Sequence, residues 1–538
     1  MCGIVGFSGP AKPDLLKRMT NALFHRGPDD EGIYADGQMN LGMRRLAIID
    51  VAGGRQPVSN EDATVLVVFN GEIYNYVELR RELESRGHVF KTDHSDTEVI
   101  VHLYEEDGES WPLKVNGMFA VAIWDLRTRK LTLYRDRLGK KPLYYCRNNN
   151  NIVFASEIKA LLCHQHVSRE LDLQSLYDFV GSRNTSAPRS IYRDIKQLLP
   201  GCYLSWHPER ECYGRAYWEI DFRPAESVGD ESEVSHTILG LLDDAVRIRM
   251  RCDVDYGAFL SGGVDSSTIV SLMQRHSTRR IKTFSLAYAD VSGPMARGKE
   301  GDRLYSAFMA KHLGTDHSEC VVCANDFLKD ARGIAQSFDE PFAGCVSGYF
   351  LARHMKPSVS VALAGDGGDE LFGSYLAHRV AIPIDTYCLY VQQGKTSLTD
   401  LTSEEIGALF PYNTPQGYAF LASVADRSIS VWRDRLRYFN HDEVASLFTR
   451  EMLEQIGYPG TCSAYKRICD KLTARDVFNK ALEIDQKECR DMADRVAYAK
   501  DRGLEDVVLN TNGTLMTREK AKAVIRSGLD AMYVGIDA

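Results

Sequence analysis

The stretch Leu260-Ser261-Gly262-Gly263-Val264-Asp265-Ser266-Ser267 decides the fold of the middle of the chain. The apolar run before it, residues 256–260, is typical of a buried strand, and residues 268–276 have the pattern of a helix. Hydroxyl side chains at the junction are available to cap that helix. The sequence thus predicts a strand, a glycine-rich turn and a helix N-terminus in succession.

A turn of this kind presents unpaired backbone N–H groups and the positive end of a helix dipole to an anion. The stretch lacks the lysine that a Walker loop places on the terminal phosphates. We therefore expect a loop that holds pyrophosphate as it leaves, with ATP split to AMP. An ordinary tight turn before a helix has the same local pattern, so this alternative stays open for the motif alone.

Strands and helices alternate around this turn. Further strands are expected at 281–286, 319–323 and 359–364, and helices at 234–250 and 304–313. The alternation predicts an α/β domain whose parallel sheet is covered by helices on both faces. Ligands in such sheets bind beyond the carboxyl ends of the strands, where the turn lies.

A second glycine-rich loop, Gly365-Asp366-Gly367-Gly368-Asp369-Glu370, follows the last of these strands. Its three carboxylates repel one another unless they share a cation, and Mg²⁺ bound to pyrophosphate is the obvious candidate. Acidic residues at a helix N-terminus are the alternative. The presence of the first loop favours the metal.

At the other end of the chain, Cys2 is a candidate nucleophile. Removal of Met1 would place a thiol and a free α-amine on one residue, and an amine with a pKa near 8 can act as a base for that thiol. Residues 44–50 are predicted to form a strand entered through two arginines, and residues 65–75 a strand ending in a polar turn. An amino-acid amide substrate needs an arginine fork, a carboxylate and oxyanion donors, which these segments contain.

Six motifs in order now resemble the glutaminase domain of glutamine-hydrolysing asparagine synthetases. They are Cys2-Gly-Ile-Val-Gly, His25-Arg-Gly-Pro-Asp29, Arg44-Arg-Leu-Ala-Ile-Ile-Asp50, Phe69-Asn-Gly-Glu-Ile-Tyr-Asn75, Ser95-Asp-Thr-Glu98 and Arg135-Asp-Arg-Leu-Gly-Lys-Lys-Pro-Leu-Tyr144. The resemblance implies an N-terminal-nucleophile fold, a four-layer αββα sandwich over residues 1–220. It implies Cys2 as nucleophile, Asn70 and Gly71 as the oxyanion hole, and Arg45, Glu72 and Asp96 as glutamine-binding residues. His25 is expected to be structural, and Met43 departs from the family's histidine as a packing change.

The two glycine-rich loops are similar to the ATP-pyrophosphatase motifs of the same family, which extends the resemblance to residues 230–488. It implies that residues Ser261 to Ser267 bind pyrophosphate and that Asp265 and Asp369 bind Mg²⁺. Leu260, Leu286 and Gly365 would line the nucleotide site. Asp366 stands where several relatives carry a glutamate that handles or positions the acceptor, and is therefore a candidate catalytic residue. The implied reaction amidates an adenylated carboxylate, most simply that of aspartate.

Residues 489–538 depart from this pattern. The family's Pro-Phe-Leu-Asp motif and its later lysine are absent, and a strand-helix-strand unit is expected instead. That unit resembles one piece of the partial barrel of radical S-adenosylmethionine enzymes, but the chain has no C-x-x-x-C-x-x-C motif to hold their cluster. Three hypotheses therefore stay open: a complete amidotransferase acting on aspartate or another acceptor, a glutaminase with a synthesis-deficient second domain, and a non-catalytic binding protein.

Composition limits the partners. Lys and Arg number 65 against 74 Asp and Glu, and there is no dense basic cluster, so small anionic ligands fit better than nucleic acid. No apolar run reaches the roughly 20 residues of a membrane span, and the first residues do not resemble a signal peptide. We expect a cytoplasmic protein with reduced cysteines, and homodimer formation is left open.

Overall fold

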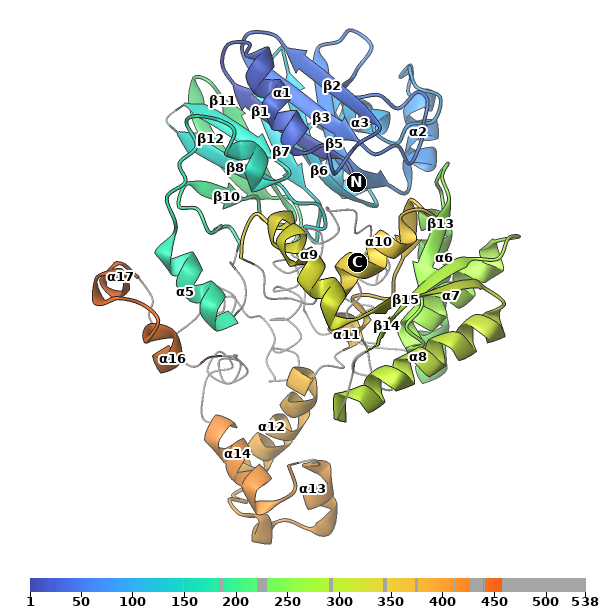
Figure 1. Ribbon diagram of the computed structural model, residues 1–538, viewed down its shortest axis with the longest axis vertical. Helices are drawn as coiled ribbons and strands as arrows, with labels where there is room; N and C mark the ends of the chain where they lie inside the picture. Colours follow the sequence, from blue (N-terminus) through green and yellow to red (C-terminus); the bar gives the residue numbers. More distant parts are fainter. Residues whose placement is uncertain are drawn as a thin grey trace.

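The computed structural model describes residues 1–148, 150–182, 185, 187–219, 230–289, 294–341, 346–372, 376–410, 412–425, 439 and 441–456 (Figure 1). The predicted boundary at 220–230 falls almost wholly outside these residues, as does the tail 489–538 with its strand-helix-strand unit. Among the described residues, no helix is long and apolar enough to cross a membrane.

The N-terminal part contains two six-stranded sheets, and every strand pair in them is antiparallel. The first sheet has the order β10-β8-β9-β1-β3-β2, with β1 (Gly3–Ser8), β2 (Asp30–Ala35), β3 (Met39–Arg45), β8 (Tyr144–Asn148), β9 (Asn151–Ala155) and β10 (Ile195–Gln197). The second has the order β12-β11-β7-β6-β5-β4, with β4 (Val58–Ser59), β5 (Val65–Ile73), β6 (Gly117–Asp125), β7 (Lys130–Arg135), β11 (Cys202–His207) and β12 (Arg210–Ala216).

Helices cover the outer faces of both sheets. Helices α1 (Pro13–Ala22) and α4 (Ile158–Leu161) pack on the first sheet, and α2 (Tyr76–Ser85), α3 (Glu98–Asp107) and the 3₁₀ helix η1 (Gly108–Lys114) belong to the side of the second. One core lies between the sheets, where Leu41 and Val68 meet, and Met43 is buried there as its predicted packing role requires. The αββα prediction is confirmed.

The middle part contains a four-stranded parallel sheet of order β15-β14-β13-β16. Its strands are β13 (Tyr256–Phe259), β14 (Lys282–Tyr288), β15 (Asp316–Val322) and β16 (Val361–Leu363). Successive strand residues face opposite sides: Ala258 packs with α6 (Glu231–Arg249), α7 (Val264–His276) and α8 (Pro294–Leu313), whereas Phe259 packs with α9 (Ala324–Ser337) and α10 (Ser347–Met355). The prediction of a parallel sheet covered on both faces is therefore confirmed.

A helical extension follows the parallel sheet (Figure 1). It begins with α11 (Gly368–Phe372) and α12 (Leu376–Gln392) and continues with η2 (Leu398–Asp400), α13 (Ser403–Ala408) and α14 (Pro415–Ala425). Tyr387 of α12 and Tyr418 of α14 meet edge to face, with ring centroids 4.9 Å apart, in the small core of this extension. Helices α5 (Leu173–Ser182), α16 (His441–Ala445) and α17 (Arg450–Gln455) form a separate cluster, in which Tyr177 packs on Phe448.

Three local predictions were wrong. Arg45 ends strand β3 instead of beginning one, because residues 46–50 wrap back over its guanidinium. Strand β5 continues through Gly71 to Ile73, since its partner β6 pairs with it along that whole length. Helix α7 begins at Val264, earlier than expected, and its N-cap is Gly263 without a side-chain hydrogen bond.

Candidate functional site

Cys2 lines a cavity of about 70 Å³ at the junction of the two parts of the chain. Its Sγ lies 3.6 Å from the carbonyl oxygen of Leu46, within reach of a thiol hydrogen bond. Burial raises the pKa of the Cys2 thiol, while the positive α-amine of Met1, which the structure retains, opposes that rise. The thiol is therefore held mainly in its protonated form, and a neighbouring base has to accept its proton before it can attack.

Asn70 lies in the wall of the same cavity, in strand β5, beside Gly71 and Glu72. Its side chain is fully buried, and neither its amide nitrogen nor its amide oxygen has a hydrogen-bond partner within the described part of the chain. A buried unsatisfied amide costs about 1–3 kcal/mol unless a ligand completes it. The free N–H of Asn70 is thus available to an oxyanion formed next to Cys2.

Arg45 and Asp96 are both buried near this cavity. The Arg45 guanidinium donates to the carbonyl oxygens of Ile49, Asp50 and Val51 at 2.7–3.1 Å, which holds that segment in place. Asp96 accepts a 2.9 Å hydrogen bond from the backbone N–H of Ile73. Burial raises the pKa of Asp96 to about 6, although that hydrogen bond and the charge of Arg45 act in the opposite direction.

Arg26 and Glu157, which are not among the predicted site residues, support the main chain of Cys2. Arg26 Nε donates to the backbone oxygen of Cys2 at 2.9 Å, and its Nη1 donates to Glu157 at 3.1 Å. His25 also binds Glu157, at 2.8 Å, in agreement with its predicted structural role. Arg26 lies inside the His25–Asp29 motif, so the motif could have indicated its role. No pattern in the sequence around Glu157 indicates one.

We expect Glu157→Gln to lower the free energy of unfolding of the N-terminal part by about 3–5 kcal/mol, because the buried Arg26 loses its counter-charge. Burial alone would raise the pKa of Glu157, but the His25 hydrogen bond and the charges of Arg26 and Lys159 hold it below its usual value. Urea unfolding followed through the buried Trp111 and Trp124 measures this loss.

The matched control for this experiment is Glu209→Gln, which removes an exposed carboxylate that pairs with Arg129 at 2.9 Å. Exposed pairs of this kind contribute about 0–1 kcal/mol. Equal effects of the two substitutions would contradict a structural role for the buried pair.

The first glycine-rich loop lies where β13 passes into α7, as expected. Ser266 Oγ bonds to Ser261 at 3.0 Å and Ser261 Oγ accepts from the backbone N–H of Gly263 at 3.3 Å, so two hydroxyls hold the loop's own shape. The buried Ser267 hydroxyl has no hydrogen-bond partner in the described ranges. Gly262 has φ +82°, and a Cβ there would lie 2.5 Å from the backbone of α8.

The second loop meets the first because β16 pairs in parallel with β13. A Cβ at Gly365 would lie 2.7 Å from the backbone nitrogen of Ser266, and one at Gly368 would lie 2.9 Å from the Asp265 carboxylate. Asp366 is buried. The backbone of Asp369 lies in α11, but its side chain falls outside the described residues.

Leu260 is fully buried and packs in the core between the sheet and α7, so its main chain alone remains to line a nucleotide site. Leu286 is partly buried on the opposite face of the sheet. The loop residues Ser261 to Ser267 and Gly365 thus come together, whereas the two leucines mainly support them from within the sheet.

The segment 249–253 joins the two parts of the chain at the Cys2 cavity. Arg251 donates to the Tyr74 carbonyl at 2.7 Å and forms a two-bond pair with Glu78. Asp253 accepts from the backbone N–H of Asp50 at 2.7 Å and lies 2.6 Å from His94 Nε2. The parallel-sheet domain therefore contacts Asp50, which Arg45 holds in place, and His94, which lies two residues before Asp96.

Two family models match the chain. Residues 1–218 match a glutamine amidotransferase domain, and residues 237–501 match asparagine synthase. Among solved structures, an allosteric regulatory enzyme of purine biosynthesis aligns at 17% identity with a TM-score of 0.32, covering 60% of this chain and 80% of that one.

Curated relatives extend over both regions. Asparagine synthetase (glutamine-hydrolysing) 1 of Bacillus subtilis is 36% identical over 72% of this chain and 61% of its own length. A protein of Methanocaldococcus jannaschii named as a putative glutamine-hydrolysing asparagine synthetase 2 is 35% identical over 70% of this chain and 76% of its own. The chain spans 52–63% of the three Bacillus subtilis relatives. This chain therefore belongs to the glutamine-hydrolysing asparagine synthetase family.

Proposed function

We propose that the protein hydrolyses glutamine at Cys2 and uses the ammonia to amidate an adenylated carboxylate, most simply that of aspartate. The observation that carries this proposal is the cavity that Cys2 shares with the unsatisfied amide of Asn70. Residues 361–363 of β16 also line that cavity, and β16 leads directly into the loop at Gly365. The source of ammonia thus lies against the domain that would consume it.

In the first reaction, once Met1 has been removed, the free α-amine of Cys2 takes the thiol proton, and the thiolate attacks the side-chain amide carbon of glutamine to form a tetrahedral intermediate. Asn70 Nδ2–H and the backbone N–H of Gly71 donate to its oxyanion. Arg45 binds the substrate carboxylate, and Asp96 with Glu72 binds its ammonium group and amide. The Cys2 ammonium returns its proton to the leaving nitrogen, so that the carbon–nitrogen bond breaks and ammonia is released. Water then hydrolyses the thioester to glutamate and restores the thiol.

In the second reaction, the acceptor carboxylate attacks the α-phosphorus of ATP, forming an acyl-adenylate and releasing pyrophosphate. The free hydroxyl of Ser267 and the N-terminus of α7 are suited to bind that pyrophosphate. Asp366 would receive or direct the proton of the incoming ammonia. Ammonia then displaces AMP from the acyl carbon.

Asp265 and Asp369 would hold Mg²⁺, which neutralises the charge of the phosphates. The Asp265 carboxylate fits this assignment because a Cβ at Gly368, the residue directly before Asp369 in the chain, would lie 2.9 Å from it. The predicted cytoplasmic location and a homodimeric assembly stay predictions.

The test is to incubate the protein with glutamine, ATP, Mg²⁺ and aspartate and to follow glutamate, AMP and asparagine together. The expected result is equal molar formation of AMP and asparagine, with at least as much glutamate. Glutamate without AMP for any carboxylate acceptor would replace the proposal with a glutaminase whose second domain cannot complete synthesis. AMP formed only with another acceptor would correct the substrate and keep the chemistry.

The acid limb of glutamine hydrolysis should report on Asp96. Since burial raises the pKa of Asp96 to about 6, protonation below that pH removes the negative charge that would bind the substrate's ammonium group. We expect the fall of kcat/KM for glutamine to become steeper well below pH 6, by about one further factor of ten per pH unit, while kcat falls less, because bound ammonium favours the carboxylate.

Asp96→Asn should lower kcat/KM and flatten this acid limb. Asp93→Asn, which changes an exposed carboxylate three residues away, should leave the limb in place. An unchanged pH profile in Asp96→Asn would assign the titration to another group.

A further inference from the structure

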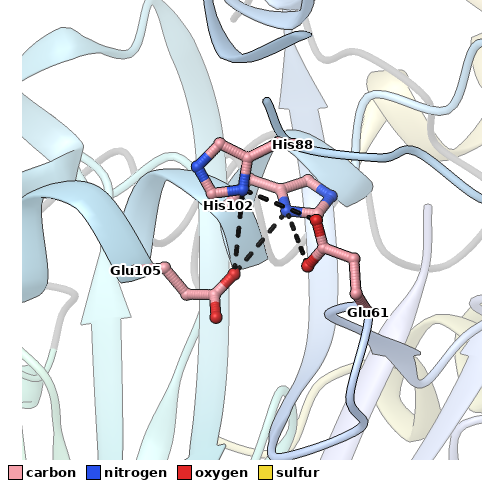
Figure 2. Close-up of side chains that lie close together, drawn as sticks. All are labelled: Glu61, His88, His102 and Glu105. Carbon is pink, nitrogen blue, oxygen red and sulfur yellow. Dashed lines mark ion pairs between the residues drawn. The ribbon is translucent and has the colours of Figure 1, made fainter. Parts of the chain in front are cut away.

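A second cluster of polar side chains lies away from Cys2, on the helix side of the second sheet. Figure 2 shows Glu61, His88, His102 and Glu105 pointing toward one another. Glu61 comes from the turn between β4 and β5, His88 follows α2, and His102 with Glu105 lies on α3. Their ligand atoms all lie within 4.8 Å of one another.

The distances within the cluster suit one shared ion better than direct hydrogen bonds. His102 Nδ1 lies 3.6 Å from Glu61 and 3.7 Å from Glu105, and His88 Nδ1 lies 3.7 Å from Glu61 and 4.0 Å from Glu105. Bonds of about 2.0–2.2 Å in a tetrahedral zinc site place donor atoms about 3.3–3.6 Å apart. Small side-chain movements would bring the four donor atoms to these distances around one ion.

The unsatisfied ring of His102 is independent evidence that an ion binds in this cluster. Its side chain is fully buried, yet neither ring nitrogen has a hydrogen-bond partner among the described residues. The Glu105 Oε2 atom beside it is also buried without a partner there. Buried polar atoms are nearly always satisfied, so a ring and a carboxylate facing each other unsatisfied indicate a missing group.

Neighbouring groups already orient the four ligands. Glu106 lies 3.1 Å from His88 Nε2, and Glu98 lies 3.8 Å from His102 Nε2, so both rings can turn Nδ1 toward the centre. Asn60 donates to Glu105 Oε1 at 2.7 Å and the Val89 N–H donates to Glu61 Oε1 at 2.9 Å. Such supporting carboxylates and donors are characteristic of metal-binding histidines.

We propose that Glu61, His88, His102 and Glu105 form a structural zinc site of the glutaminase domain. Two imidazole nitrogens and two carboxylate oxygens suit Zn²⁺, whereas Mg²⁺ prefers oxygen ligands alone. The bound ion would join the β4–β5 turn and the segment after α2 to α3. It has no part in the chemistry at Cys2 or at the phosphate loops.

The test uses full-length protein stripped with a chelator and then titrated with Zn²⁺ against a competing chromophoric chelator. The wild type should take up one more zinc than Glu61→Gln and His88→Gln, and its melting temperature should rise with zinc while theirs does not. Both positions lie at the surface end of the cluster, so circular dichroism should confirm that the variants fold. Glu106→Gln should weaken zinc binding by about 10–100-fold, since it only orients His88.

Cobalt distinguishes this site from the cysteines. Co²⁺ at the cluster should give visible tetrahedral bands without a thiolate charge-transfer band, and His88→Gln should remove them. His276→Ala is the control, because it removes an exposed histidine bound to Asp243 at 2.9 Å elsewhere in the chain. No zinc uptake, equal uptake by wild type and both ligand variants, or a loss in His276→Ala as large as in His88→Gln would overturn the proposal.

Discussion

Cys2→Ala should abolish glutamine hydrolysis, by at least about 10⁴-fold, while ammonium salts still support AMP formation. The reason is that the substitution removes the atom that forms the covalent intermediate, whereas the phosphate loops lie in the other domain. The hydrogen bond from the thiol to the Leu46 carbonyl is long, 3.6 Å, so alanine should leave the surrounding structure in place. Measuring glutamate with glutamine, and AMP with ammonium chloride, separates the two activities.

The matched control is Cys252→Ala, which removes another thiol from the wall of the same cavity. It should retain glutamine hydrolysis within a few-fold. Loss of both activities in Cys2→Ala would contradict the division of the reaction between two sites, and full activity would exclude Cys2 as the nucleophile.

Gly262→Ala should reduce ATP-dependent AMP formation by about 10²-fold or more and leave glutamine hydrolysis intact. A Cβ at this position would lie 2.5 Å from the backbone nitrogen of Ser306 and the carbonyl carbon of Tyr305. Neither backbone can give way cheaply, so the loop has to move. A displacement of about 1 Å at a reacting group is enough for a loss of this size.

Gly314→Ala separates the clash from the backbone conformation. Gly314 has φ +69°, similar to the +82° of Gly262, but a Cβ there would meet nothing within 4 Å. Both substitutions carry the cost of a left-handed residue, about 1–2 kcal/mol. Of the two, only Gly262→Ala also creates a steric clash with the backbone of α8. Equal kinetics in the two variants would show that the contact with α8 is unimportant.

Sequence patterns predicted the layers of both domains because hydrophobic periodicity reflects which face of each strand is buried. The alternation of Ala258 and Phe259 between two cores is the kind of pattern from which a two-sided sheet follows. Strand ends were less predictable. Arg45 ends β3 because three carbonyl groups of residues 49–51 gather on its guanidinium, a tertiary contact with no local signal.

The residues of the candidate site likewise fall into those that the sequence predicted and those that it could not. Cys2, Asn70 and the loop at Ser261–Ser267 lie in recognisable motifs, and the fold places each beside its expected neighbours. Glu157 and Asp253 come from isolated positions distant in sequence from the residues that they support. Only folding brings such residues to the site, so single-sequence reasoning could not select them.

Strand β1 lies in the interior of its sheet, between β9 and β3, although it precedes every other described strand in the chain. Its partner β9 begins at Asn151, so one edge of β1 stays unpaired until about 150 residues have been made. At about 5–20 residues per second, that is a wait of roughly 8–30 s on the ribosome. During this interval the apolar segment Gly3–Ser8 next to Cys2 lacks one of its two strand partners, and rapid translation should favour yield of the folded domain.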